Sequence, residues 1–156
     1  MIDDIDDNID DILRKHRMWL AGEMGGERGR LTGMDLRGRD FRSAILRHAT
    51  MTGADLTRAT MCNADLYGVY MVDADLCGAD LRGADMSDAD MTGVDLTGAD
   101  MGGGTLLRAD LSGANLTGVD LSGANLTRAD LTGAILRRAI LRRADLTDAI
   151  GVDLTS

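Results

Sequence analysis

The sequence predicts an all-β solenoid, in which short extended segments wind the chain repeatedly around one axis. Leu, Met or Phe occupies every fifth position from Leu31 to Leu146, at 24 sites without a slip. Two positions earlier, from Ala44 to Ala149, the residue is almost always Ala. Five is neither the period of a strand nor that of a helix, so the fold must itself repeat every five residues.

The order of residues within each repeat predicts which side chains face inward. An extended segment sends alternate side chains to opposite faces, so in each Ala-Asp-Leu triplet Ala and Leu face the axis and Asp faces outward. The next two residues are mostly Thr, Ser, Gly or Arg and form a corner. Successive turns of the chain then pair edge to edge at about 4.8 Å, as strands do in a sheet. The chain contains no proline, which suits such a ladder of backbone hydrogen bonds.

The tandem motifs ADLSG, ANLTG and ADLTR resemble those of the pentapeptide repeat family, from Leu31 to roughly Leu146. The resemblance implies a right-handed quadrilateral β-helix with four pentapeptides, hence twenty residues, in each coil. The repeat then makes about six coils and a rod about 29 Å long. A coil of this length predicts that one set of corner residues stacks along one edge of the rod: Asp88, Arg108, Arg128 and Asp148.

The residues before the repeat predict an amphipathic helix over residues 1–22 that caps the first coil. Apolar residues recur there at intervals of three and four, which places them on one helix face. These residues are Ile2, Ile5, Ile9, Ile12, Leu13, His16, Trp19 and Leu20. Residues 23–30 form a Gly-rich hinge, because no Gly-Lys-Ser/Thr follows to make a phosphate-binding loop. The β-helix is expected to occupy residues 31–156.

Few residue types that carry catalytic chemistry are present. The two histidines, His16 on the helix and His48 alone at a corner, cannot assemble a catalytic triad or a zinc motif. Cys62 and Cys77 are expected to be free thiols on different sides of the rod. A solid core offers no active-site cavity, so we expect no enzyme activity, cofactor or metal. The acidic N-terminus lacks the pattern of a signal peptide, and no stretch is long enough to span a membrane, which favours a cytoplasmic protein.

The negative charge is concentrated in the middle of the repeat. The formal net charge of -9 argues against direct binding of nucleic acid or an anionic membrane and favours a protein partner with a basic surface. Residues 59–107 hold nine acidic residues against Arg82 alone, whereas the flanking segments nearly balance. At twenty residues per coil, Asp75 stacks on Asp95 and Asp80 on Asp100. We call these four residues the acidic strip, and either local hydrogen bonding or a partner explains them.

The resemblance also suggests a function for the acidic strip. Quinolone-resistance proteins of this family bind DNA gyrase as DNA mimics, commonly as dimers joined at their C-terminal ends. The sequence therefore favours a non-enzymatic binding scaffold that mimics DNA toward a topoisomerase or another DNA-binding enzyme. The alternative is a structural or assembly spacer of bacterial or phage origin with no DNA-mimic role.

The last predicted coil differs from the others at its outward positions. Ile135, Ile140 and Ile150 replace the usual Asp or Asn, and four arginines crowd two corners: Arg137, Arg138, Arg142 and Arg143. An apolar cluster rimmed by charge beside an open edge is typical of an interface. We therefore expect a homodimer through the C-terminal end, with the N-terminal helix and Trp19 as the rival interface.

Overall fold

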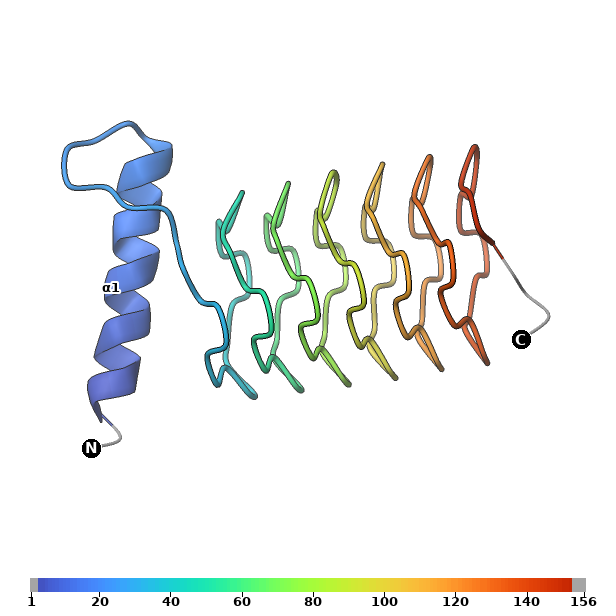
Figure 1. Ribbon diagram of the computed structural model, residues 1–156, viewed down its shortest axis with the longest axis horizontal. Helices are drawn as coiled ribbons and strands as arrows, with labels where there is room; N and C mark the ends of the chain where they lie inside the picture. Colours follow the sequence, from blue (N-terminus) through green and yellow to red (C-terminus); the bar gives the residue numbers. More distant parts are fainter. Residues whose placement is uncertain (1–2, 153–156) are drawn as a thin grey trace.

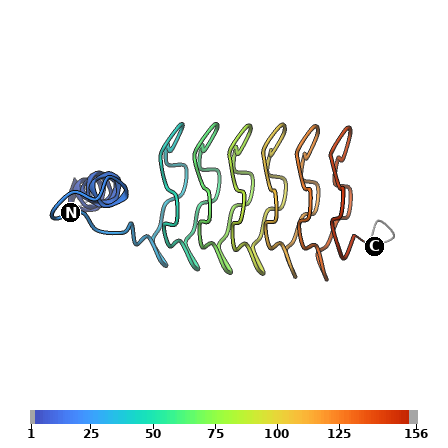
Figure 2. The ribbon, with the colours of Figure 1, turned by 90° about the horizontal axis from the view of Figure 1, so that it is seen from above.

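The computed structural model describes residues 3–152, and the side chains of residues 8–152. Helix α1 (Asp3–Leu20) lies across one end of a rod, and the chain then advances coil by coil to the other end (Figures 1 and 2). Within the described residues α1 is the only helix, and the repeat forms isolated parallel β-bridges in place of extended strands. The first and last described residues therefore lie at opposite ends of the molecule.

The bridges give the length of each coil. Every bridge joins a residue to the one twenty positions later, from Arg30 with Thr50 to Asp130 with Ile150. Bridges recur at every fifth residue, so each twenty-residue coil has four sides and residues 31–150 make six coils. The predicted period is therefore confirmed.

The corner residues that were predicted to stack also do so. Arg108 donates two hydrogen bonds to the Asp88 carboxylate, both of 2.6 Å, from the coil that follows. Further along the same edge, Arg128 Nε lies 3.6 Å from an oxygen of Asp148. A coil of three sides would have separated these residues, so the four-sided interpretation is confirmed.

Each pentapeptide closes its own corner and bonds to the next coil. In the segment from Leu111, the Ala114 N–H donates to the Leu111 carbonyl at 3.0 Å, and Gly113 between them has a φ of 68°. This is the left-handed conformation that the third residue of a type II turn requires. The Leu111 and Gly113 amides donate to Asp130 and Thr132 of the following coil, at 2.8 and 2.9 Å. The regular spacing of glycine in the sequence thus follows from the turn.

Arg58 occupies one of these left-handed corner positions, with a φ of 58°. Gly78 and Gly98 occupy the same corner in the next two coils. A side chain in this conformation costs about 1–2 kcal/mol, and Arg58 forms no ion pair among the described residues. We therefore expect Arg58→Gly to raise the free energy of unfolding by about 1 kcal/mol. Urea unfolding would measure the change. Arg108→Gly is the control, since it also loses the Asp88 pair, and a larger gain there would contradict the explanation.

The inward side chains form the core of the rod. The large side chains at every fifth position are fully or almost fully buried from Leu31 to Leu136, with small Ala side chains beside most of them. On the N-terminal side, Ile9 of α1 is buried, and Ile12 and Leu13 pack against this core, so the helix covers the first coil as predicted. His16, which also belongs to α1, is fully buried as well.

Two residues of the predicted apolar helix face do not pack against the rod. Trp19 and Leu20 remain 39% and 36% exposed, although they lie on the apolar helix face predicted from the sequence. The reason is that the hinge, and not the first coil, covers this end of α1: Gly26 approaches the backbone of Trp19 so closely that no side chain would fit there. Ile2 and the side chain of Ile5 lie outside the described part of the chain.

The repeat ends where the sequence breaks register. Ile150 makes the final bridge, and Gly151 then bends the chain with a φ of 70°. A side chain at Gly151 would collide with the backbone of Thr132, so glycine is required at this point. Residues 153–156 of the predicted repeat range lie outside the described residues.

Candidate functional site

The acidic strip consists of two columns on adjacent sides of the rod. Asp75 bridges to Asp95 on one side, and Asp80 bridges to Asp100 on the next. The corners between the two columns carry small residues, Cys77–Gly78 in one coil and 97–98 in the next. All four carboxylates are partly exposed, so a partner that approaches this corner can reach both columns.

Each Asp of the acidic strip also has a structural role. The Oδ1 atom accepts the backbone N–H two residues later, at 2.9 Å for Asp75 and Asp95, 3.3 Å for Asp80 and 3.0 Å for Asp100. The predicted local hydrogen bonding is therefore confirmed. The Oδ1 atoms of Asn115 and Asn125 make equivalent bonds of 3.2 and 3.0 Å in later coils. The turn thus requires an acceptor at this position and does not require a negative charge.

The two columns differ in how far their charge is compensated. Arg82 lies 2.6 Å from Asp80 and 3.7 Å from Asp100, and its hydrogen bonds hold the pKa of Asp80 well below the usual range. Asp75 and Asp95 have no ion-pair partner among the described residues. The column of Asp75 and Asp95 is therefore the more strongly negative of the two.

Cys77 lies between these carboxylates and stays neutral. Burial first, and then Asp75 and Asp95, raise the pKa of its thiol to about 12. Burial acts to raise the pKa of Asp95 as well, but hydrogen bonds from Thr97, Cys77 and Asn115 outweigh it and lower that pKa. Asp95 is therefore ionised at neutral pH although it is partly covered. Cys62 and Cys77 are both free.

The remaining mid-rod carboxylates face other directions. Asp65 and Asp85 bridge along a third side, and Asp90 lies on the fourth. Asp65 pairs with Arg47 at 2.5 Å, which reduces the charge on that side. The negative charge counted in the sequence thus forms a belt around the rod, because outward positions five residues apart face directions a quarter turn apart.

The same quarter-turn rule separates the C-terminal isoleucines. Ile135, Ile140 and Ile150 are 42%, 41% and 56% exposed and lie on three different sides of the last coil. The prediction of a single apolar cluster is therefore wrong, and the three side chains instead ring the end of the rod. The inward Leu141 and Leu146 of this coil are only partly covered, so the ring surrounds an apolar end face.

A cluster that the sequence analysis missed lies beside α1. The Arg28 guanidinium donates to the His48 carbonyl at 2.5 Å and lies 4.9 Å from the centre of the Tyr70 ring. His48, predicted to be alone, meets the Tyr67 ring edge-on at 5.4 Å, and Arg47 lies 5.6 Å from that ring. The twenty-residue period was the available signal, since it places Arg30, Thr50 and Tyr70 in one column.

His16 joins α1 to the hinge from a fully buried position. Its Nδ1 accepts the Gly29 N–H at 3.0 Å, and its ring stacks on Trp19 at 5.7 Å. Its Nε2 has no hydrogen-bond partner among the described residues. Burial lowers the pKa of His16, and electrostatic interactions with Arg28 and His48 lower it further, whereas the Arg47 backbone acts to raise it. The ring is therefore neutral when α1 is docked.

Two further findings concern the chain between residues 3 and 152. No helix in this range has the length and apolar character needed to cross a membrane. In the same range, no three His, Cys, Asp or Glu side chains are grouped so that they could hold a metal ion.

A rod of stacked four-sided coils, with a filled core and its chemistry on the outside, defines a solenoid repeat protein. The chain belongs to the pentapeptide repeat family, whose model, "Pentapeptide repeats", matches in 8 copies over residues 30–61, 62–98, 70–106, 89–133 and 109–148. Members of this family fold as right-handed quadrilateral β-helices and are generally structural or binding proteins. The four-sided β-helix that the resemblance implied is thus confirmed.

Several solved structures are similar to this chain. A pentapeptide repeat protein of the Arabidopsis thaliana thylakoid lumen is 32% identical, over 69% of this chain and 71% of that one, with a TM-score of 0.42. HetL, involved in heterocyst differentiation regulation in the cyanobacterium Nostoc, is 32% identical over 80% and 73%, with a TM-score of 0.34. QnrB1, a plasmid-mediated fluoroquinolone resistance protein, is 22% identical over 82% and 81%, with a TM-score of 0.51. Comparison with curated proteins returns no match.

Proposed function

We propose that the protein is a non-enzymatic binding scaffold that mimics DNA, with its acidic strip occupying the basic groove of DNA gyrase or another DNA-binding enzyme. One observation carries the proposal: the turns of the strip need only an acceptor, which Asn115 and Asn125 supply elsewhere, yet all four strip positions hold Asp. The negative charge of the strip is therefore free to serve a partner.

The spacing of the charges supports the same function. Coils lie about 4.8 Å apart, so two adjacent columns present one carboxylate per about 2.4 Å of rod. Duplex DNA presents one phosphate per about 1.7 Å of its axis. The shared fold with QnrB1, a fluoroquinolone resistance protein, makes gyrase the first enzyme to test.

The test replaces Asp75, Asp80, Asp95 and Asp100 together with Asn. Because Asn keeps the turn bonds, we expect an unchanged fold but at least about tenfold weaker inhibition of gyrase supercoiling, with a smaller dependence on salt, as for electrostatically steered binding. The inhibition would be measured across a series of salt concentrations.

A matched variant separates the strip from net charge. Asp85, Asp90, Asp110 and Asp130 make the same turn bonds on the other two sides of the rod, so their replacement by Asn changes the net charge equally. Inhibition by this control should stay close to wild type. An equal loss of gyrase inhibition in both variants would reject a specific role of the acidic strip. The absence of inhibition by the wild type at tens of micromolar would favour the structural spacer.

We also propose that two copies join through their C-terminal ends. Such a dimer has a two-fold axis perpendicular to the rod, and a four-sided coil allows four directions for it. The corners at residues 137–138 and 142–143 carry arginines. With the axis in three of these four directions, an arginine corner of one copy meets an arginine corner of the other. The fourth passes through the sides of Ile135 and Asp145, and it places Ile140 against Ile150 and the corner of Arg143 against that of Asp148.

This arrangement makes a specific prediction about assembly. Ile140→Asp should give monomers in sedimentation experiments, because it places a charge in an apolar contact. Arg143→Asp should weaken the dimer by like-charge repulsion with Asp148 of the second copy, and the added Asp148→Arg should restore it. A monomeric wild type at micromolar concentration would exclude the dimer, and a double variant that fails to recover would exclude this axis.

A further inference from the structure

We propose that the junction of α1 and the rod is a second binding surface, which takes a short acidic segment of a partner protein. The surface is an aromatic–arginine patch composed of Trp19, Arg28, Arg30, Arg47, Tyr67 and Tyr70. The acidic strip takes no part in it, and the chemistry of the partner is the opposite of a basic groove. The proposal therefore goes beyond the DNA-mimic function.

The patch gathers nearly all the aromatic side chains of the protein. The chain has one Phe, one Trp and two Tyr, and only Phe41 belongs to the core. Trp19 and Tyr70 are exposed and Tyr67 is partly exposed, all beside α1 and the first coils. Trp, Tyr and Arg are the residues that most often dominate protein interfaces. A core built from aliphatic side chains gives no reason for this concentration.

The arginines of the patch are positioned to receive an anion. Arg28 is held by the His48 carbonyl and the Tyr70 ring, so that its guanidinium is fixed in place. Arg30 is exposed and has no ion pair within the described chain. On its side of the rod, the same outward position holds Asp90 and Asp110 farther along. The side therefore changes from acidic to basic as it approaches α1.

Two open hollows lie beside these arginines. One, of about 490 Å³, lies between Trp19, Gly26, Glu27, Arg28 and Arg30. The other, of about 430 Å³, is lined by Arg28, Arg30 and the threonines Thr32, Thr50 and Thr52. Hollows of this size accommodate a few side chains. Guanidinium groups and threonine hydroxyls can bind carboxylates there, while the Trp19 ring offers apolar contact.

The surroundings favour a short segment over a long polyanion. Asp11 of α1 lines a hollow together with Arg28 and Arg30 at one end of the patch, and Asp90 lies beyond Tyr70 at the other end. A nucleic acid that crossed the patch would meet these carboxylates on both sides. A peptide with two or three acidic residues and an aliphatic side chain fits between them.

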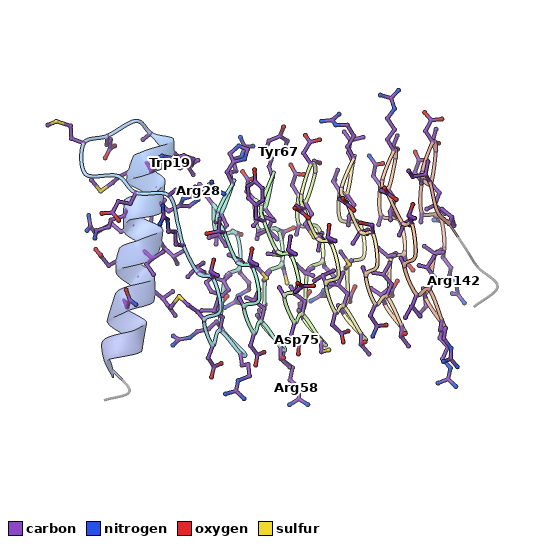
Figure 3. All side chains as sticks on the ribbon, in the orientation of Figure 1. Trp19, Arg28, Arg58, Tyr67, Asp75 and Arg142 are labelled. Carbon is purple, nitrogen blue, oxygen red and sulfur yellow. The ribbon has the colours of Figure 1, made fainter. Side chains whose placement is uncertain are left out.

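The patch and the acidic strip face different directions. In Figure 3, Trp19, Arg28 and Tyr67 lie along one edge of the molecule, and Asp75 lies toward the opposite edge. The sides of Tyr70 and Asp80 are half a coil apart, hence opposite each other on a four-sided rod. A partner on the patch therefore leaves the strip accessible, so the two surfaces can be tested separately.

Trp19 is the only tryptophan, so its fluorescence reports directly on the patch. The probe is a short acetylated peptide of alternating Glu and Leu, titrated into the full chain. We expect a saturable change in Trp19 fluorescence that weakens at least about tenfold in Arg30→Glu and persists in Arg30→Lys. Arg58→Glu is the matched control and should bind the peptide like wild type. Arg58 is exposed, forms no ion pair among the described residues and lies toward the edge opposite Trp19 and Tyr67 (Figure 3).

Each other outcome would overturn the proposal. One such outcome is the absence of a saturable change in Trp19 fluorescence in the wild type. Another is equal affinity of the Arg30→Glu and Arg58→Glu variants for the Glu–Leu peptide. A Lys–Leu peptide that binds as well would show that the contact is only apolar. Tighter binding of oligothymidylate, lost in Arg30→Glu, would assign the patch to nucleic acid. Sedimentation that shows dimers broken by Arg30→Glu would assign it to a second copy of the chain.

Discussion

Leu76→Ala is expected to lower the free energy of unfolding by about 2–5 kcal/mol, the range for a fully buried leucine whose surroundings cannot collapse. Leu76 is completely buried in the middle of the rod, between Leu56 and Leu96 of the neighbouring coils. Backbone hydrogen bonds of 2.7 and 2.8 Å from Leu56 and Leu96 fix those coils, so the cavity would persist. Urea unfolding followed by far-ultraviolet circular dichroism would measure the loss.

Leu146→Ala provides the matched comparison for Leu76. The same residue type occupies an inward position in the last coil, but there it is only partly buried. We expect less than half the loss seen for Leu76→Ala, since less apolar area leaves water and the cavity opens to solvent. Equal losses at the two sites would mean that the C-terminal end is covered in solution, which would support the dimer.

Acidification is expected to release α1 from the rod through His16. The docked helix holds the pKa of His16 below its usual 6.5, because the ring is buried and Gly29 donates to Nδ1. Docking is therefore at full strength above pH 6.5. As the pH falls below 6.5, the undocked state takes up a proton first, and docking weakens by up to about 1.4 kcal/mol per pH unit until the pKa of the docked state is reached.

Hydrogen exchange of the α1 amides between pH 7.5 and 4.5, corrected for intrinsic exchange rates, would measure this release. His16→Leu should make docking independent of pH in that window, although it loses the bond to Gly29. His48→Asn is the control for the other histidine. Because His48 makes only the last of the contributions that lower the His16 pKa, this variant should keep the release of α1 and shift its midpoint only slightly. The Asp11 carboxyl beside Lys15 has a pKa lowered from 3.8 and does not titrate in this window. If the pH dependence of α1 exchange were lost in His48→Asn and kept in His16→Leu, the explanation would be rejected.

The sequence by itself determined the winding of the rod. Leu, Met or Phe at every fifth residue, a small residue two positions earlier and a residue that tolerates positive φ at the corner are each required by one coil side, so the same local chemistry repeats along the chain. The stacking of Asp88 with Arg108 follows from the same period, once twenty residues per coil are assumed. The resemblance to pentapeptide repeats supplied that number, because periodicity alone does not distinguish three sides from four.

Only the tertiary structure decided which directions the surface residues face. Ile135, Ile140 and Ile150 are neighbours in the sequence pattern but point to different sides of the coil, and the mid-rod carboxylates divide in the same way. The aromatic–arginine patch forms because α1 and the hinge fold back over the first coil and bring Trp19 and Arg28 toward Tyr70. A five-residue repeat specifies which side chains face inward and which face outward. The contacts between α1 and the first coil depend on how the helix docks, which the repeat does not encode.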